Sequence, residues 1–161
     1  MGELIDLRPN VTEGDLPLIR GIVEKTGMFR PAEVEIATEL IGEFLERGSD
    51  SGYRFTVAES AGEVVGYACF GPIPCTVASY DLYWIAVHPS QHRRGLGRRI
   101  LQDVETRIAR DGGTRIYVDT SGRAAYEATR LFYEGMGYDQ AAILPDFYAP
   151  GDAKIIYVKS I

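Results

Sequence analysis

The chain has 161 residues, of which 45% are hydrophobic and 25% are charged, and its formal net charge is -6. This length and composition predict a single globular domain over residues 1–161 and exclude a disordered chain. The acidic balance argues against general binding to nucleic acid or an anionic membrane, because the summed field repels phosphate groups. Without a signal peptide or a long apolar run, we expect a cytoplasmic protein with reduced thiols at Cys69 and Cys75.

The first quarter of the chain predicts one strand and two helices. Residues 3–9 suit the strand, and Thr12 with Asp15 at the spacing of a capping box predicts a helix that ends at Gly27. Pro31 suits the first turn of a second helix. The apolar positions of that helix repeat on one face: Val34, Ala37, Leu40, Ile41, Phe44 and Leu45.

The middle of the chain predicts three strands. Residues 53–60 and 63–73 form a hairpin, because alternating Tyr53, Phe55 and Val57 have the period of a half-buried strand and "SAGE" suits a turn. Residues 79–87, "SYDLYWIAV", are apolar on both faces, which is typical of a central strand covered by helices on both sides.

The remaining elements alternate between helix and strand. A helix carrying Ile100, Leu101, Val104 and Ile108 precedes a strand over residues 114–120, so this strand and the one at 79–87 should be parallel with a right-handed crossover. A helix over residues 125–136 and a pair of strands at 138–144 and 153–161 complete the prediction.

Positive charge gathers between the central strand and the next helix, in "HPSQHRRGLGRRIL" at residues 88–101. Gly95 and Gly97 remove side chains at a helix start, where backbone N–H groups and the helix dipole favour an anion. Four arginines flank them: Arg93, Arg94, Arg98 and Arg99. The turn is either a solvated basic turn or a phosphate-binding turn. It is neither a P-loop nor the dinucleotide fingerprint, which needs glycine where Ile100 stands.

The run "IAVHPSQHRRGLGRRIL" resembles motif A of the GNAT superfamily of N-acetyltransferases, in which V-x-P is followed by Q/R-x-x-G-x-G/A. Downstream, "RLFYEGMGY" is similar to the superfamily's F-Y-x-x-x-G-F/Y signature. His92 departs from the usual Gln or Arg. The resemblance covers roughly residues 53–160. It implies an α/β fold with a mixed sheet of about seven strands, splayed between strands 4 and 5, and four helices.

The resemblance also implies acetyl-CoA as the co-substrate. Its pantetheine arm is expected to pair with the backbone of the central strand, and its diphosphate to lie on the glycine turn. The cofactor-binding residues are then Ile85, Ala86, Val87, Arg93, Arg94, Gly95, Leu96, Gly97 and Arg98.

Direct acetyl transfer to an amine requires a base for the amine proton and an acid for the departing thiolate. Tyr133 is the expected acid, because it lies one step off the core face set by Ala125, Ala128, Leu131 and Phe132 and so points toward the strand gap. The alternative is a core tyrosine.

Two aspartates are candidates for the base. Asp81 is preferred, since it shares a strand face with Tyr83, Ile85 and Val87 and corresponds to the catalytic glutamate of histone-type members. Asp119 is the second candidate, near the position used by ribosomal-protein N-terminal acetyltransferases. The alternative for either is a strand-end aspartate bonded to backbone or solvent.

The acceptor site is expected to include Met28, Phe29, Tyr83 and Tyr148. The segment "DFYAPGDAKIIYVK" is similar to the closing segment of N-terminal protein acetyltransferases and supports a primary amine acceptor: a small amine, an amino acid or a peptide N-terminus. No metal is expected, because His88 and His92 have no third ligand nearby. A homodimer is left open. The rivals are a non-catalytic acyl-CoA-binding domain and a nucleic-acid-binding domain, and the net charge argues against the second.

Overall fold

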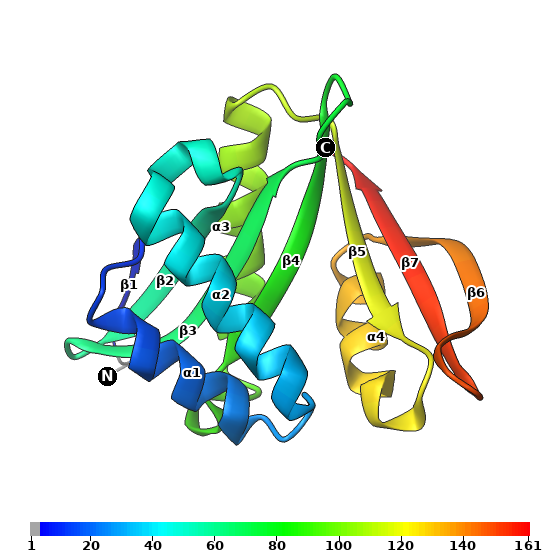
Figure 1. The fold of residues 1–161 in the computed structure, drawn as a ribbon, viewed down its shortest axis with the longest axis horizontal. Helices are drawn as coiled ribbons and strands as arrows, with labels where there is room; N and C mark the ends of the chain where they lie inside the picture. The colour runs from blue at the N-terminus through cyan, green and yellow to red at the C-terminus, as the bar shows by residue number, and fades with distance from the viewer. Residues whose placement is uncertain (1–3) are drawn as a thin grey trace.

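A seven-stranded mixed sheet with helices on both faces forms the computed structural model, which describes residues 4–161 (Figure 1). The strands lie in the order β1-β2-β3-β4-β5-β7-β6. Their bounds are β1 Ile5–Arg8, β2 Arg54–Ser60, β3 Glu63–Pro72, β4 Ser79–Val87, β5 Arg115–Ser121, β6 Asp139–Ala149 and β7 Asp152–Ser160. The helices are α1 Asp15–Lys25, α2 Pro31–Arg47, α3 Leu96–Arg110 and α4 Glu127–Gly135. The predicted fold class is confirmed; the expected strand start at residue 3 lies outside the described residues.

The two faces of the sheet carry separate hydrophobic cores. On one face α1 and α2 bury a cluster that includes Ile19, Val23, Ile41, Phe55 and Tyr67. On the other face α3 and α4 bury a larger cluster that includes Ile100, Val104, Ile116, Tyr133 and Tyr157. A site between two separated strands of this sheet can therefore be reached from either face.

The parallel strands β4 and β5 separate after a short paired stretch. Their register joins Ser79–Leu82 of β4 to residues 115–118 of β5. Beyond that point β5 stays paired with β7 along residues 115–121, and β4 stays paired with β3. The last residues of β4 and β5 therefore enclose a wedge, which opens toward the lower edge of Figure 1. The predicted parallel pairing and the predicted splay between strands 4 and 5 are confirmed.

A β-bulge in β4 changes which side chains face the wedge. The register with β3 passes from the Phe70–Leu82 pair to the Cys69–Trp84 pair, so Tyr83 is an extra residue in β4. Leu82 packs in the core under α3, and so does Ile85. These two residues are three positions apart, whereas a regular strand turns every second side chain to the same face. The prediction that Asp81 and Tyr83 share a face with Ile85 and Val87 is therefore wrong.

A buried ion pair fixes the start of α1 against the sheet. The Asp15 carboxylate accepts hydrogen bonds from Arg8 Nη2 at 2.6 Å and from the Thr12 backbone N–H at 2.7 Å. Burial acts to raise the pKa of Asp15, but the hydrogen bonds from Arg8 and Thr12 outweigh burial and leave the pKa below its usual range. The expected capping box is wrong: Thr12 donates to Asp15, but the N-cap of α1 is Gly14, and no side chain in the described part of the chain caps the helix.

Candidate active site

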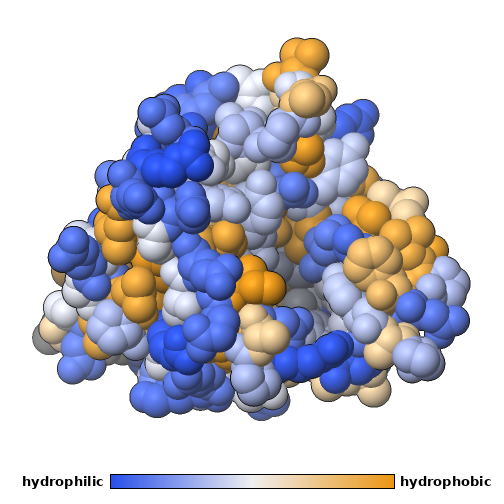
Figure 2. Space-filling view, viewed as in Figure 1, coloured by the Kyte–Doolittle hydropathy of each residue, from blue (hydrophilic) through white to orange (hydrophobic). Residues whose placement is uncertain are grey.

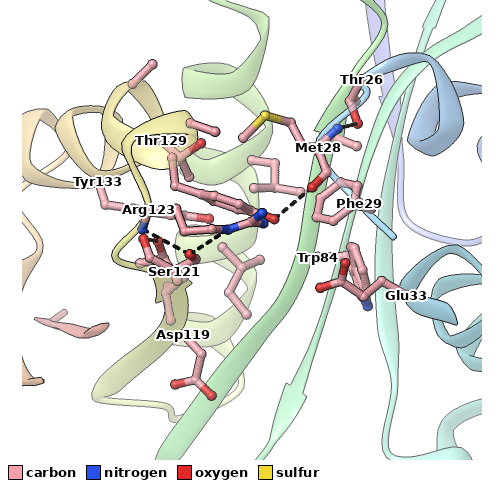
Figure 3. A pocket seen from close by; sticks show the side chains of 18 of the residues that line it. Thr26, Met28, Phe29, Glu33, Trp84, Asp119, Ser121, Arg123, Thr129 and Tyr133 are labelled. Atoms are coloured by element: carbon pink, nitrogen blue, oxygen red, sulfur yellow. Dashed lines mark hydrogen bonds between the residues drawn. The ribbon is translucent and has the colours of Figure 1, made fainter. Parts of the chain in front are cut away.

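A cavity of about 470 Å³ fills the wedge between β4 and β5. Figure 2 shows it as a hollow between the two halves of the sheet, and Figure 3 shows its lining from close by. The lining comes from the α1–α2 connection, α2, β4, the β5–α4 segment, α4, and the facing ends of β6 and β7. Among the lining residues are Met28, Phe29, Arg30, Glu33, Tyr83, Trp84, Ile85, Ala86, Val87, Asp119, Ser121, Arg123, Tyr126, Tyr133, Tyr148 and Asp152.

The glycine turn lies directly before α3. Gly95 has φ +78° and Arg93 has φ +60°, so the chain makes a left-handed turn immediately before the helix begins at Leu96. A Cβ atom built on Gly95 meets nothing within 4 Å, which means that the turn faces open space. The first amides of α3 have no partner inside the helix, and the helix dipole adds partial positive charge at this end. The expected arginines Arg93 and Arg98 are exposed beside the turn.

The turn and the cavity are joined through His92. Residues 93–98 lie outside the cavity lining, whereas His92 belongs to it. Its Nε2 lies 3.0 Å from the carbonyl oxygen of Val87, at the end of β4. His92 is exposed, and the sequence did not predict its part in the lining.

Successive main-chain groups of β4 point alternately toward β3 and toward the wedge. The N–H of His88 donates to Val65 of β3 at 2.8 Å, so the main-chain groups of the preceding residue, Val87, point the other way. By the same alternation, the main chain of Ile85 also faces the wedge, while that of Ala86 faces Tyr67 of β3. Ile85 and Val87 thus turn their main-chain groups toward the wedge, where the sequence predicts pairing with the donor, although the carbonyl oxygen of Val87 already lies within hydrogen-bond distance of His92.

Tyr133 brings a buried hydroxyl to the cavity. Its side chain is 4% exposed and packs against the rings of Tyr138 and Tyr157 at 5.6 Å and 6.2 Å. Within residues 4–161 its hydroxyl has no hydrogen-bond partner, and burial raises its pKa well above the usual value. The group therefore keeps its proton at neutral pH.

The predicted helical phase of α4 is wrong even though Tyr133 reaches the cavity. Leu131, expected in the core, is 60% exposed, and Tyr133, expected to one side, faces inward. The helix begins only at Glu127, after a 3-10 turn over Ala124–Tyr126, so the 3.6-residue period starts later than the apolar pattern indicates.

The two candidate bases lie in different surroundings. Asp119 lines the cavity, and its carboxylate forms an ion pair with Lys154 Nζ at 2.8 Å. Asp81 lies in the paired part of β4, half-buried, and is not among the lining residues. Burial and then the charge of Asp119 raise the pKa of Asp81. The structure therefore places Asp119, and not the preferred Asp81, at the wedge.

The expected acceptor residues Met28, Phe29, Tyr83 and Tyr148 all line the cavity. Phe29 packs edge-on against Trp84 with ring centroids 4.6 Å apart. Burial, followed by nearby carboxylates, raises the pKa of Tyr148 to about 12. Phe29 and Trp84 pack against the core under α1 and α2, whereas Tyr148 reaches the cavity from β6.

Sequence reasoning missed several polar lining residues: Glu33, Ser121, Arg123, Tyr126 and Asp152. A usable signal was present, because the polar segment "SGR" at residues 121–123 begins at the last residue of β5. Ligands of open α/β sheets bind beyond the carboxyl ends of the strands, and this polar segment is at such an end.

In the part of the chain that the structure describes, no group of three His, Cys, Asp or Glu side chains is arranged to hold a metal ion. His88 instead accepts a hydrogen bond from the Ser90 N–H through its Nδ1 at 3.1 Å. No helix within residues 4–161 has the length and apolar character needed to cross a bilayer.

A family model described as an acetyltransferase (GNAT) domain matches residues 51–140, more than half of the chain. The chain belongs to the GNAT acetyltransferase family. The predicted family and enzyme class are thereby confirmed. A solved structure from Desulfovibrio desulfuricans, assigned to the GNAT family, is 43% identical to this GNAT chain, with a TM-score of 0.96, and the match covers 98% of this chain and 99% of that one.

Two further relatives have named activities. The [ribosomal protein bS18]-alanine N-acetyltransferase of Escherichia coli K12 is 30% identical over 87 residues, which cover 54% of this GNAT chain and 57% of the relative. The chain thus spans about half the length of the curated relatives it matches. The PaiA N-acetyltransferase of Thermoplasma acidophilum, solved in complex with coenzyme A, shares the fold at 15% identity, with a TM-score of 0.76 and 98% and 99% of the two chains covered.

Proposed function

We propose that this GNAT chain transfers an acetyl group from acetyl-CoA to a primary amine, by direct attack in a ternary complex and without a covalent enzyme intermediate. One observation carries the proposal: the wedge between β4 and β5 holds a cavity that reaches His92, next to the glycine turn, and is lined by Tyr133. The coenzyme A bound by the PaiA relative supports the same donor.

The residues of the turn suit the donor's diphosphate. The open space at Gly95, the free amides of α3 and the exposed guanidinium groups of Arg93 and Arg98 together offer directed donors and positive charge to an anion. The pantetheine arm of acetyl-CoA carries amide groups, which match the main-chain groups that Ile85 and Val87 turn toward the wedge.

Transfer requires a neutral amine nitrogen, which attacks the thioester carbonyl carbon and forms a tetrahedral intermediate. The intermediate collapses as the carbon–sulfur bond breaks, and Tyr133 donates its hydroxyl proton to the leaving sulfur. The amine proton goes to a carboxylate, for which Asp119 is the first candidate because it lines the cavity. Asp81 stays the second, acting from outside the lining through water.

The decisive experiment is an acceptor screen that follows release of the free CoA thiol and identifies products by mass. The panel should contain straight-chain mono- and diamines, free amino acids and a short peptide with N-terminal alanine, the last suggested by the bS18-alanine relative. Isothermal titration calorimetry with acetyl-CoA should accompany it. Acetyl-CoA binding with no thiol release from any acceptor would contradict the proposal and favour a non-catalytic acyl-CoA-binding domain.

A further inference from the structure

Five side chains and main-chain groups form a strap across the cavity: Met28, Arg30, Arg123, Tyr126 and Asp152. Tyr126 Oη donates to the carbonyl oxygen of Met28 at 3.0 Å. The Arg123 guanidinium lies 5.3 Å from the centre of the Tyr126 ring, and its Nε lies 3.3 Å from the Asp152 carboxylate. Arg30 Nη2 lies 3.7 Å from the same carboxylate. Figure 3 shows Met28 and Arg123 facing each other across the cavity.

The strap joins parts of the fold that are far apart in the sequence. Met28 and Arg30 belong to the α1–α2 connection, Arg123 and Tyr126 to the β5–α4 connection, and Asp152 begins β7. The α1–α2 connection lies over the half of the sheet that contains β1 to β4. Arg123, Tyr126 and Asp152 lie in the half that contains β5, β7 and β6. The strap therefore spans the opening that the splayed strands leave.

One end of the strap is held much more firmly than the other. Asp152 is 4% exposed and also accepts a hydrogen bond from Ser121 Oγ, so its buried charge depends on the partners around it. At the opposite end, the Arg30 side chain is 53% exposed, and the carbonyl oxygen of Met28 accepts the hydrogen bond from Tyr126, while the Met28 N–H donates to Thr26 Oγ1 of the same connection at 3.4 Å. An opening motion would break the contacts at the α1–α2 end first.

The α1–α2 end of the strap lies on the face opposite the donor turn, from which we expect the acceptor to approach. The donor turn begins α3, and α3 covers the same face of the sheet as Tyr133. The α1–α2 connection covers the opposite face, together with Trp84. With a volume of about 470 Å³, the cavity is near the lower end of the roughly 300–1,000 Å³ typical of ligand pockets. It has to receive both the acyl end of the donor and the amine.

From this arrangement we propose that the strap selects acceptors by width. The acceptor is a primary amine on a slender, unbranched carbon chain, and a polypeptide N-terminus reaches the wedge only when the strap contacts of Met28 and Arg30 are broken. Tyr126 and Arg30 are then specificity-determining residues. The inference rests on the proposed function and narrows its acceptor class.

The test compares kcat/KM for a straight-chain diamine with kcat/KM for a tripeptide carrying N-terminal alanine. Wild-type protein is expected to favour the diamine by about tenfold or more. Tyr126→Phe removes the hydrogen bond to Met28 and keeps the ring under Arg123, so it should lower that ratio about 3-fold to 10-fold. Adding Arg30→Gln should lower it further.

Tyr117→Phe is the matched control, because this half-buried β5 tyrosine is not among the cavity-lining residues. It should leave the ratio unchanged. Melting temperatures of all variants show that they are folded, and the acetyl-CoA Kd of each shows whether the strap acts on the donor instead.

Three outcomes would overturn the inference. Equal efficiency of wild-type protein with the diamine and the tripeptide would do so, and so would an unchanged ratio in the double variant. Weaker acetyl-CoA binding with an unchanged ratio would assign the strap to the donor site. Absence of thiol release with every acceptor would overturn the proposed function itself, which separates that failure from the other three.

Discussion

The two walls of the cavity are built in different ways. The β4 wall consists of β4 and leads through His92 to the turn at Gly95, and beyond the bulge at Tyr83 it presents main-chain groups and apolar side chains. The β5 wall consists of β5, α4 and the start of β7. It presents ionisable and hydrogen-bonding side chains: Asp119, Ser121, Arg123, Tyr133 and Asp152.

This difference separates binding from catalysis. Main-chain recognition depends on the path of the backbone and tolerates changes of side chain, whereas proton transfer depends on one atom of one residue. We therefore expect the β4 wall to be sensitive to changes of backbone conformation, and the β5 wall to be sensitive to the loss of single polar groups.

The largest effect is expected at the backbone of the β4 wall. Gly95→Val puts a β-branched residue at φ +78°, a conformation that such residues rarely adopt, and fills the open space of the turn. Acetyl-CoA binding should fall below detection in titration calorimetry, while circular dichroism shows a folded protein. Wild-type affinity in a folded variant would show that the turn binds no diphosphate.

Next in size is the loss of one hydroxyl from the β5 wall. Tyr133→Phe should lower kcat by about 10²-fold to 10⁴-fold, the usual range for a positioned general acid, and leave the acetyl-CoA Kd close to normal. The melting temperature should change little, because the ring is kept and the hydroxyl loses no partner within residues 4–161. A lower melting temperature with intact kcat would mean a structural tyrosine.

A smaller, pH-dependent effect is expected from the carboxylate of the β5 wall. Amines with a pKa near ~10 are mostly protonated at neutral pH. Asp119→Asn should therefore lower kcat/KM most at neutral pH, and the defect should shrink as alkaline pH supplies neutral amine. The measurement is a pH profile of kcat/KM beside wild-type protein.

Asp81→Asn is the matched comparison for this profile, because Asp81 lies outside the cavity lining. It should keep nearly normal kcat/KM. The variant should also be more stable than wild-type protein at neutral pH. Burial raises the pKa of Asp81 in the folded state, so wild-type protein loses stability as pH rises through that pKa. The uncharged asparagine avoids this loss. A profile in which only the Asp81 variant is impaired would return the role of base to β4.

The smallest effect should follow a side-chain change on the β4 wall. Ile85→Val keeps the backbone and removes one methylene group, so kcat/KM should change by less than about threefold, and the free energy of unfolding should fall by roughly 0.5–1.5 kcal/mol. Steady-state kinetics and chemical denaturation measure the two quantities. A large loss of activity at constant stability would show that the side chain of Ile85, and not its main chain, binds the donor.

Local patterns in the sequence predicted the fold well. The apolar run at residues 79–87 coincides with β4, and Pro31 begins α2, because a central strand and a helix start each depend on neighbouring residues. The bulge at Tyr83 was not predictable in this way. It is defined by the register against β3, and an alternating pattern does not show which residue is the extra one.

The candidate site was predicted where a motif names consecutive residues and missed where distant segments meet. The turn at Gly95 and the hydroxyl of Tyr133 each belong to one short motif. The contact between Tyr126 and Met28 joins residues 98 positions apart and arises only when α1, α2 and α4 have packed on the sheet. The inward phase of Tyr133 likewise depends on where α4 starts, which its apolar pattern indicates poorly.

The position of β7 has a consequence for how the catalytic wall is assembled during folding. Although β7 follows every other strand along the chain, it lies inside the sheet, between β5 and β6 (Figure 1). Until residues 152–160 have left the ribosome, β5 has no neighbour on that side, and Asp119 lacks its partner Lys154. Formation of this half of the sheet requires long-range pairing, which is slow and leaves strand edges exposed to aggregation. A nascent chain stalled before β7 should therefore bind chaperones through β5.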